Sequence, residues 1–164
     1  MGNGFTFPRN LQGREEIRGG ITQLSDHVAA RLRLCGMKCQ GVSLAIRDPD
    51  FHDISRQTRL DTPTYLGREL AQAAMALADQ CWSMDRPVRA LTVTAIYLIP
   101  AEEAAAQLEL WDAPRQHQRE RRERLEQTMD AIRAKYGGRA IQPASAPRNT
   151  ASTGHDPFPD REGT

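Results

Sequence analysis

The stretch Gly41–Leu60, GVSLAIRDPDFHDISRQTRL, decides the fold, because it contains two strand-like runs around a tight turn at residues 48–50. The first run alternates between two sets, Val42, Leu44 and Ile46 against Ser43, Ala45 and Arg47. In the second run the polar set is Asp53, Ser55, Gln57 and Arg59. Successive residues of a strand point to opposite faces, so the pattern predicts a hairpin with one core face and one polar face. Hydroxyl, amide and guanidinium donors suit phosphate oxygens, although a solvated sheet face would carry similar groups.

Periodicity on either side of the hairpin predicts the other elements. Gly4–Phe7 alternates and is followed by Pro8, which is typical of a short strand at a sheet edge. Apolar residues recur every three or four positions in Arg14–Leu34 and again in Thr64–Trp82, so both segments are expected to be helices. Val88–Leu98 is rich in β-branched residues and alternates, which indicates a strand.

The order strand, helix, strand, strand, helix, strand predicts an α+β fold. We expect a four-stranded antiparallel sheet with two helices on one face (β-α-β-β-α-β) and the other face open, followed by a C-terminal helix and a disordered tail. Residues 1–100 would form this domain and residues 101–114 a linker. Residues 115–142 would form a charged helix with a short extension. Residues 143–164, rich in Pro, Ser, Thr and Asp, should be disordered.

Composition narrows the class of protein. The 164 residues carry a net charge of +1, so any basic surface for nucleic acid must come from local segregation of charge. Aromatic residues make up 5%, too few for a base-stacking platform. No apolar run is long enough to span a bilayer, and the first ten residues do not resemble a secretion signal, so we expect a cytoplasmic location and no membrane partner. The three cysteines lack the partners of a zinc site and are expected to be reduced thiols.

The C-terminal third contains two further features. Residues 107–112, QLELWD, form a compact amphipathic peptide. Arg115–Lys135 is charged and helical in pattern, with a thin apolar stripe of Leu125, Met129 and Ile132. Its first ten residues, RQHQRERRER, are compatible with a DNA-facing patch, while ion pairs three and four residues apart favour a solvated helix.

Four segments in this order resemble the little-finger domain of Y-family translesion DNA polymerases. They are GNGFTFPRNL at 2–11, VSLAIRDPDFHDISRQTRL at 42–60, DRPVRALTVTAIYL at 85–98 and LEQTMDAIRAKYGGRAIQPAS at 125–145. The last of these is similar to the C-terminal end of bacterial members. In the family's last-strand pattern, Thr92 stands where glycine is usual.

The resemblance implies a DNA-gripping domain whose open sheet face lies in the major groove of duplex primer–template DNA. Contacts of this kind go mainly to the phosphate backbone and are independent of sequence. The implied DNA-binding residues are Asn3, Thr6, Ser55, Arg56, Arg59 and Arg89, with Gln57 added from strand alternation. Ala90 and Thr94 stand where some relatives have arginine, which implies a weaker grip.

The peptide QLELW resembles the sliding-clamp-binding motif of bacterial polymerases. The resemblance implies that Gln107, Leu108, Leu110 and Trp111 bind the bacterial sliding clamp, with the apolar side chains as anchors. The alternative is a short strand or helix end that tucks its leucines into the core.

Polymerases of this family hold two magnesium ions on carboxylates of a catalytic core that precedes the little finger. The chain as given lacks those carboxylates, so we expect no polymerase activity and no cofactor of its own. Mg²⁺ would belong to the absent core, and a separately encoded core remains open as a partner. One rival hypothesis is an interaction module that competes for the clamp and has no role on DNA. Another is a standalone enzyme, for which the sequence offers no candidate pocket.

Overall fold

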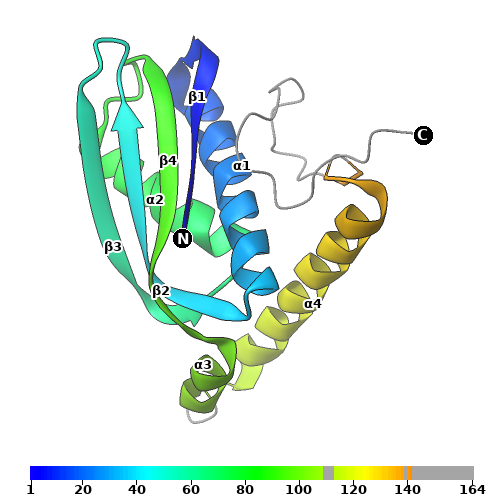
Figure 1. Ribbon diagram of the computed structural model, residues 1–164. Coiled ribbons are helices and arrows are strands. Elements are labelled where there is room, and N and C mark those ends of the chain that lie inside the picture. Colours follow the sequence, from blue (N-terminus) through cyan, green and yellow to red (C-terminus); the bar gives the residue numbers. More distant parts are fainter. Residues whose placement is uncertain (109–112, 139, 142–164) are drawn as a thin grey trace.

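The computed structural model describes residues 1–108, 113–138 and 140–141 (Figure 1). Its elements are β1 (Gly2–Leu11), α1 (Gly13–Leu34), β2 (Met37–Arg47), β3 (Asp53–Thr64), α2 (Gly67–Cys81), β4 (Val88–Pro100), α3 (Ala101–Leu108) and α4 (Ala113–Tyr136). The predicted order of the four strands and of α1, α2 and α4 is confirmed, whereas α3 lies in the segment predicted to be a linker. The predicted disordered tail, residues 143–164, lies outside the described residues.

The four strands form one antiparallel sheet in the order β1-β4-β2-β3. Helices α1 and α2 cover one face of this sheet and leave the other uncovered (Figure 1). The predicted α+β architecture is therefore confirmed. None of the described helices is both long enough and apolar enough to cross a membrane.

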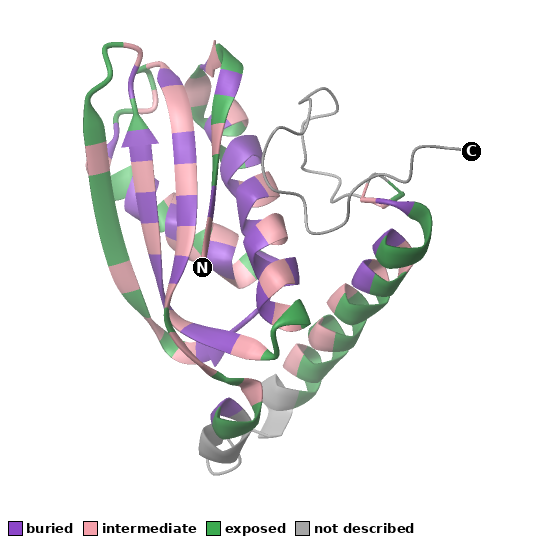
Figure 2. Cartoon of the chain, in the orientation of Figure 1, coloured by how far each residue is buried: buried purple, intermediate pink, exposed green. Residues whose placement is uncertain are grey.

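The core lies between the sheet and the two helices. Val42, Leu44 and Ile46 of β2 are at most 1% exposed, as the alternation in the hairpin predicted. They pack in one cluster with apolar residues of both helices, among them Ile21 and Leu70. Figure 2 shows the resulting bands of buried and partly exposed residues along the central strands. Removing this apolar surface from water is the main stabilising contribution to such a fold.

Several element ends differ from the sequence prediction, and two of these differences have a local structural reason. Strand β1 runs past Pro8 to Leu11, and its pairing with β4 shifts register between Thr6 and Leu11. An edge strand with a bulge tolerates proline because the missing N–H is not needed there. Helix α2 begins at Gly67 and not at Thr64, which ends β3 and accepts a hydrogen bond at Oγ1 from the N–H of Leu66, at 3.0 Å.

Helix α4 packs back on the domain through charged side chains. Five residues spaced three and four apart form this surface, which we call the docking seam: Arg119, Glu123, Glu126, Asp130 and Arg133. The spacing is that of an apolar helix stripe, but here charges occupy it. The predicted stripe of Leu125, Met129 and Ile132 lies beside the seam, and Leu125 is 60% exposed.

Arg33 at the end of α1 is the centre of the seam's contacts. Its guanidinium pairs with Glu126 and donates to both carboxylate oxygens of Asp130, at 2.5 and 3.0 Å. Glu126 also accepts hydrogen bonds from the backbone N–H of Gly67, at 3.1 Å. Because Leu66 offers no side-chain cap, this carboxylate from α4 satisfies the N-terminus of α2. Burial raises the pKa of Glu126, although Arg33 opposes that shift.

The remaining seam contacts lie on either side of Arg33. Lys38 donates to Glu123 at 3.0 Å, and Arg119 and Arg133 pair with Glu69 and Asp26 at 3.3 and 2.7 Å. Arg119, in the arginine-rich segment at the start of α4, is therefore engaged in contacts within the fold. In the same segment Arg124 lies 3.8 Å from Glu120, one of the helical ion pairs that the sequence indicated.

Candidate nucleic-acid interface

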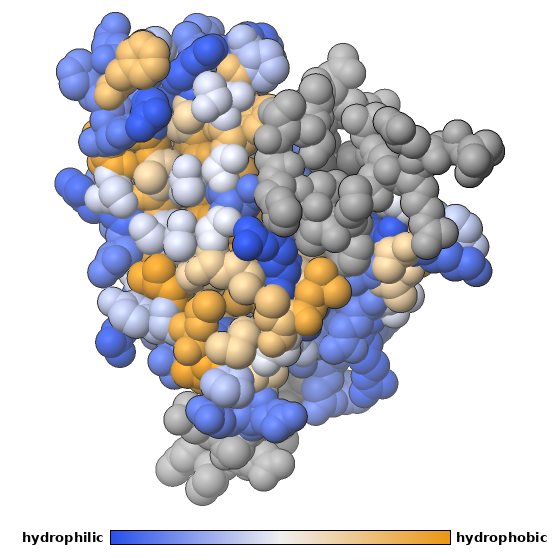
Figure 3. Space-filling view, viewed as in Figure 1, coloured by the Kyte–Doolittle hydropathy of each residue, from blue (hydrophilic) through white to orange (hydrophobic). Residues whose placement is uncertain are grey.

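The uncovered face of the sheet is defined by strand register, because directly paired residues of an antiparallel sheet point to the same side. Ser43 of β2 pairs with Gln57 of β3 and with Thr94 of β4, and Thr94 pairs with Gly2 of β1. Ser43, Gln57, Thr94 and Gly2 form one row of a surface that we call the open face. Its other rows of paired residues are Gly4, Thr92, Ala45 and Ser55; Thr6, Ala90, Arg47 and Asp53; and Ile96, Gly41 and Arg59. In Figure 3 near-neutral residues cross the middle of this face, between a hydrophilic region at the hairpin and an apolar zone.

Two glycines of β1 keep this face flat. A Cβ atom at Gly4 would lie 2.4 Å from Oγ1 of Thr92, and one at Gly2 would lie 2.6 Å from Oγ1 of Thr94. Both distances are too short for real atoms, so the threonine side chains occupy the space that side chains on β1 would fill. The result is a shallow surface of hydroxyl and amide groups on which an extended partner can approach the sheet closely.

The open face holds little free charge. Arg47 and Asp53, direct cross-strand partners, form a two-bond ion pair at 2.7 and 2.8 Å. The hydrogen bond from Arg47 lowers the pKa of Asp53, so this carboxylate stays ionised and neutralises the arginine. Arg59 differs. Its guanidinium carbon lies 4.7 Å from the ring centroid of Tyr97, and within the described residues no carboxylate lies at salt-bridge distance from it.

The structure divides the predicted DNA-binding residues. Thr6, Ser55, Gln57 and Arg59 lie on the open face. Asn3 does not: it is 6% exposed, and its Nδ2 lies 3.1 Å from Nδ1 of His27 on α1. Strand alternation explains this, because Asn3 pairs with the buried Val93.

Arg56 and Arg89 are also placed away from the open face. Arg56 pairs with the buried Leu44, so it lies on the helix side of the edge strand, where it donates to the carbonyl of Ser55 at 2.8 Å. Arg89 has the parity of the core residue Leu91 and donates to the carbonyl of Phe7 at 3.0 Å, beside the bulge of β1. For both residues the family resemblance implied a place on the open face, whereas strand alternation in this chain puts them on the helix side.

Three hydroxyl-bearing residues of the open face were not among the predicted contacts: Ser43, Thr92 and Thr94. The alternation of Ala90, Thr92 and Thr94 in the last strand was the available signal. Their proximity to β1 could not be derived without the register that sets two glycines opposite the two threonines.

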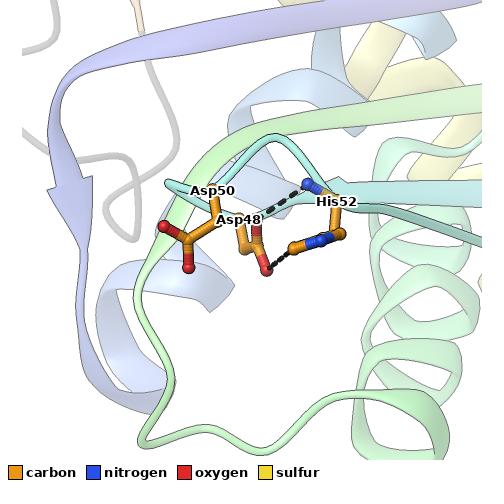
Figure 4. A group of neighbouring side chains, drawn as sticks. All are labelled: Asp48, Asp50 and His52. Atoms are coloured by element: carbon orange, nitrogen blue, oxygen red, sulfur yellow. Dashed lines mark hydrogen bonds and ion pairs between the residues drawn. The ribbon is translucent and has the colours of Figure 1, made fainter.

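The tip of the hairpin carries a second polar cluster, Asp48, Asp50 and His52, shown in Figure 4. Their ligand atoms lie within 4.8 Å of one another, a spacing that a metal ion could bridge. Asp48, however, accepts a hydrogen bond from the backbone N–H of His52 at 2.9 Å and pairs with Arg86 at 3.1 Å. The hydrogen bond from the backbone N–H of His52 lowers the pKa of Asp48, and the His52 ring lowers it further. The cluster thus fixes the turn.

The clamp-like peptide is described in part. Gln107 and Leu108 are the last residues of α3, whereas Leu110 and Trp111 lie outside the described residues. The prediction for these four residues stays a prediction.

Comparison with known proteins identifies the family. The model described as the impB/mucB/samB family C-terminal domain matches residues 1–110. DNA polymerase IV of Acetivibrio thermocellus is 32% identical over 137 residues, which are 84% of this chain and 34% of that protein. DNA polymerase IV of Pelotomaculum thermopropionicum is 33% identical over 141 residues, 86% of this chain and 33% of that protein. The chain thus spans about a third of the length of the curated relatives it matches.

A solved structure described as a complex of the beta-clamp processivity factor and the little finger domain of PolIV aligns with 60% of this chain and 85% of its own. The identity is 16% and the TM-score 0.48, a likeness too low to support an inference. The chain therefore belongs to the impB/mucB/samB family, and it corresponds to the C-terminal, little-finger domain of Y-family DNA polymerases.

Proposed function

We propose that the open face binds the phosphate backbone of duplex primer–template DNA and serves a translesion DNA polymerase as its grip on the DNA. The observation that carries the proposal is a flat sheet face that neither α1 nor α2 covers, lined by hydroxyl and amide groups, in a domain of this family. The contacting side chains would be Thr6, Ser43, Ser55, Gln57, Arg59, Thr92 and Thr94.

The chemistry of this face suits a grip that ignores base identity. Hydroxyl and amide donors meet phosphate oxygens at any sequence, and phosphate contacts set position without reading base edges. A grip of this kind fits lesion bypass, because a damaged base leaves the backbone in place. The scarcity of free cations predicts modest affinity and a modest dependence of affinity on salt.

The test is fluorescence-anisotropy binding of the purified chain to labelled primer–template duplex at several salt concentrations. Arg59→Ala should weaken binding and reduce the slope of log affinity against log salt by about one. Arg18→Ala, which removes an exposed arginine from α1 on the covered side, is the charge-matched control and should leave both quantities unchanged. Binding that is indifferent to salt, or equal losses in the two variants, would contradict the proposal.

A second variant tests the same face with the opposite sign. Asp53→Asn removes the carboxylate that neutralises Arg47, so the freed guanidinium becomes available to a phosphate and affinity should rise. Asp79→Asn is its control, because Asp79 pairs with Arg14 between the two helices and lies on the covered side. Binding unchanged by Asp53→Asn would place the DNA away from this row of the sheet.

The sequence motif at residues 107–111 favours a second function, docking on the bacterial sliding clamp. Leu110 and Trp111 would supply the apolar anchors, and Gln107 an amide that orients the peptide. The double variant Leu110→Ala and Trp111→Ala should abolish clamp binding and leave DNA binding intact.

Leu125→Ala is the matched control for this peptide, because Leu125 is a leucine that lies 60% exposed on α4. It should bind the clamp as tightly as the unsubstituted chain. Clamp binding that survives the double variant would remove the peptide from the proposal, and clamp binding without any DNA binding would favour the interaction module.

A further inference from the structure

Tyr97 on β4 has a backbone conformation that its residue type rarely adopts. Its φ is 54°, and it shares a positive φ with one other non-glycine residue of the described chain, Phe51 in the hairpin turn. Tyr97 lies inside a strand, between Ile96, which pairs with Gly41, and Leu98, which pairs with Cys39. For an aromatic residue a positive φ is strained, and such strain persists where the surroundings enforce it.

The conformation brings the ring of Tyr97 to the open face. Alternation alone would direct Tyr97 to the helix side, together with Ala95, which is 1% exposed. Instead its Cδ2 atom lies 3.0 Å from the point where a Cβ atom of Gly41 would stand, on the side to which Gly41 and its partner Arg59 point. That Cβ would also lie 2.9 Å from Cγ1 of Ile96, so only glycine fits here. The side chain of Tyr97 remains 45% exposed.

Arg59 lies on this ring. It is the direct cross-strand partner of Gly41, and its guanidinium carbon is 4.7 Å from the ring centroid. Stacking on an aromatic face restrains the planar guanidinium while its N–H donors, which lie in the plane, stay available. The ring thus restrains the arginine of the open face that has no carboxylate partner among the described residues, whereas Arg47 is held by Asp53.

We infer that Tyr97 is a positioning residue that holds the guanidinium of Arg59 ready to donate to a phosphate oxygen of the DNA backbone. The inference rests on the proposed binding of DNA by the open face. An arginine side chain gives up considerable rotamer freedom when it is fixed on a ligand, and a side chain that is already ordered gives up less on binding. Gly41 has a part in the same arrangement, because its missing side chain makes room for the ring.

The test is a double-mutant cycle on DNA affinity. Tyr97→Leu keeps apolar bulk and removes the aromatic face, so affinity should fall by about two- to fivefold, the usual range for an exposed cation–π contact. Tyr97→Phe keeps the ring and should bind like the unsubstituted chain. In an Arg59→Ala background Tyr97→Leu should have no further effect. Equal effects of Tyr97→Leu in the two backgrounds would overturn the inference.

A variant at the other partner covers the case in which Tyr97→Leu impairs folding. Arg59→Lys keeps the charge and loses the planar group, so it should weaken binding as Tyr97→Leu does. Adding Tyr97→Leu to Arg59→Lys should then have no further effect on affinity. Lysine that binds as well as arginine would overturn the positioning role while leaving the proposed function intact. An unsubstituted chain that does not bind duplex DNA would overturn both.

Discussion

The open face and the docking seam differ in how deeply their arginine side chains are buried and how they are paired. Arg133 of the seam and Arg33, which the seam contacts, have side chains only 5% and 6% exposed, and each has at least two partners. On the open face Arg47 is about half exposed and neutralised by one neighbour, and Arg59 rests on an aromatic ring. A buried charge needs a counter-charge within the fold, whereas an exposed charge can exchange its partner for a ligand. The seam therefore belongs to the structure, and the open face is suited to a partner.

Removing the centre of the seam should have the largest effect. Arg33→Ala leaves Glu126 and Asp130, 16% and 11% exposed, without their main counter-charge, and should lower the free energy of unfolding by about 3–5 kcal/mol. Urea denaturation followed by circular dichroism measures this. Arg9→Ala is the control: it breaks an ion pair with Glu16 whose partners are 73% and 36% exposed, so solvent screens the pair and the loss should be much smaller. Equal losses in the two variants would show that the seam is a surface contact.

A methyl group added to the open face should have an intermediate effect. Gly4→Ala sets a Cβ atom against Oγ1 of Thr92 and should cost about 1–3 kcal/mol through overpacking. Thr92→Ala removes the clashing hydroxyl, so the cost of Gly4→Ala should shrink in that background. Thermal denaturation of the four chains gives the coupling. Strictly additive losses would mean that the two strands are not in this register.

The sequence predicted the open face better than the seam. Alternation in β2 and β3 assigned Ser55, Gln57 and Arg59 to the polar side of the hairpin, and the register agrees. The alternation of side chains depends only on the strand itself, so it can be predicted without knowing how the rest of the chain folds. Carrying residues over from the family gave Asn3 and Arg56, whose parity in this chain puts them on the helix side.

The seam could not be predicted, because its partners are distant in the chain. Glu126 meets Arg33 and Gly67, which are 93 and 59 residues away. A helix surface of charged residues gives the same sequence pattern whether it faces water or counter-charges, so the sequence does not distinguish the two cases. The residues of α4 that pack on the domain are those that lie opposite complementary charges on α1, α2 and the start of β2.

Tyr65 can report directly on docking of α4. Burial and the nearby carboxylate of Glu123, 3.1 Å from its hydroxyl, raise the pKa of Tyr65 to about 12. Glu123→Gln should lower this pKa part of the way, because burial remains. The neutral phenol's contribution to stability is present below the ordinary tyrosine value and is lost as the pH rises through about 12, so the variant should lose it at lower pH. Ultraviolet titration of the phenolate measures the shift.

The control for this titration comes from the same helix. Glu120→Gln removes a carboxylate that pairs with Arg124 on the outer side of α4, and should leave Tyr65 unchanged. A Tyr65 pKa unaffected by Glu123→Gln would mean that α4 does not pack against the residue that follows β3 in solution.

The smallest effect is expected at the thin apolar stripe of α4, formed by Leu125, Met129 and Ile132. Leu125 is 60% exposed, so Leu125→Ala should change the free energy of unfolding by no more than about 0.5 kcal/mol. Leu70→Ala on α2, at a position 0% exposed, should cost about 2–5 kcal/mol through loss of burial and a cavity. The same urea experiment compares the two leucines. A loss at Leu125 that approaches the loss at Leu70 would mean that α4 docks through its apolar stripe, and the contrast between a structural seam and an open binding face would fail, because the seam arginines would then be free as well.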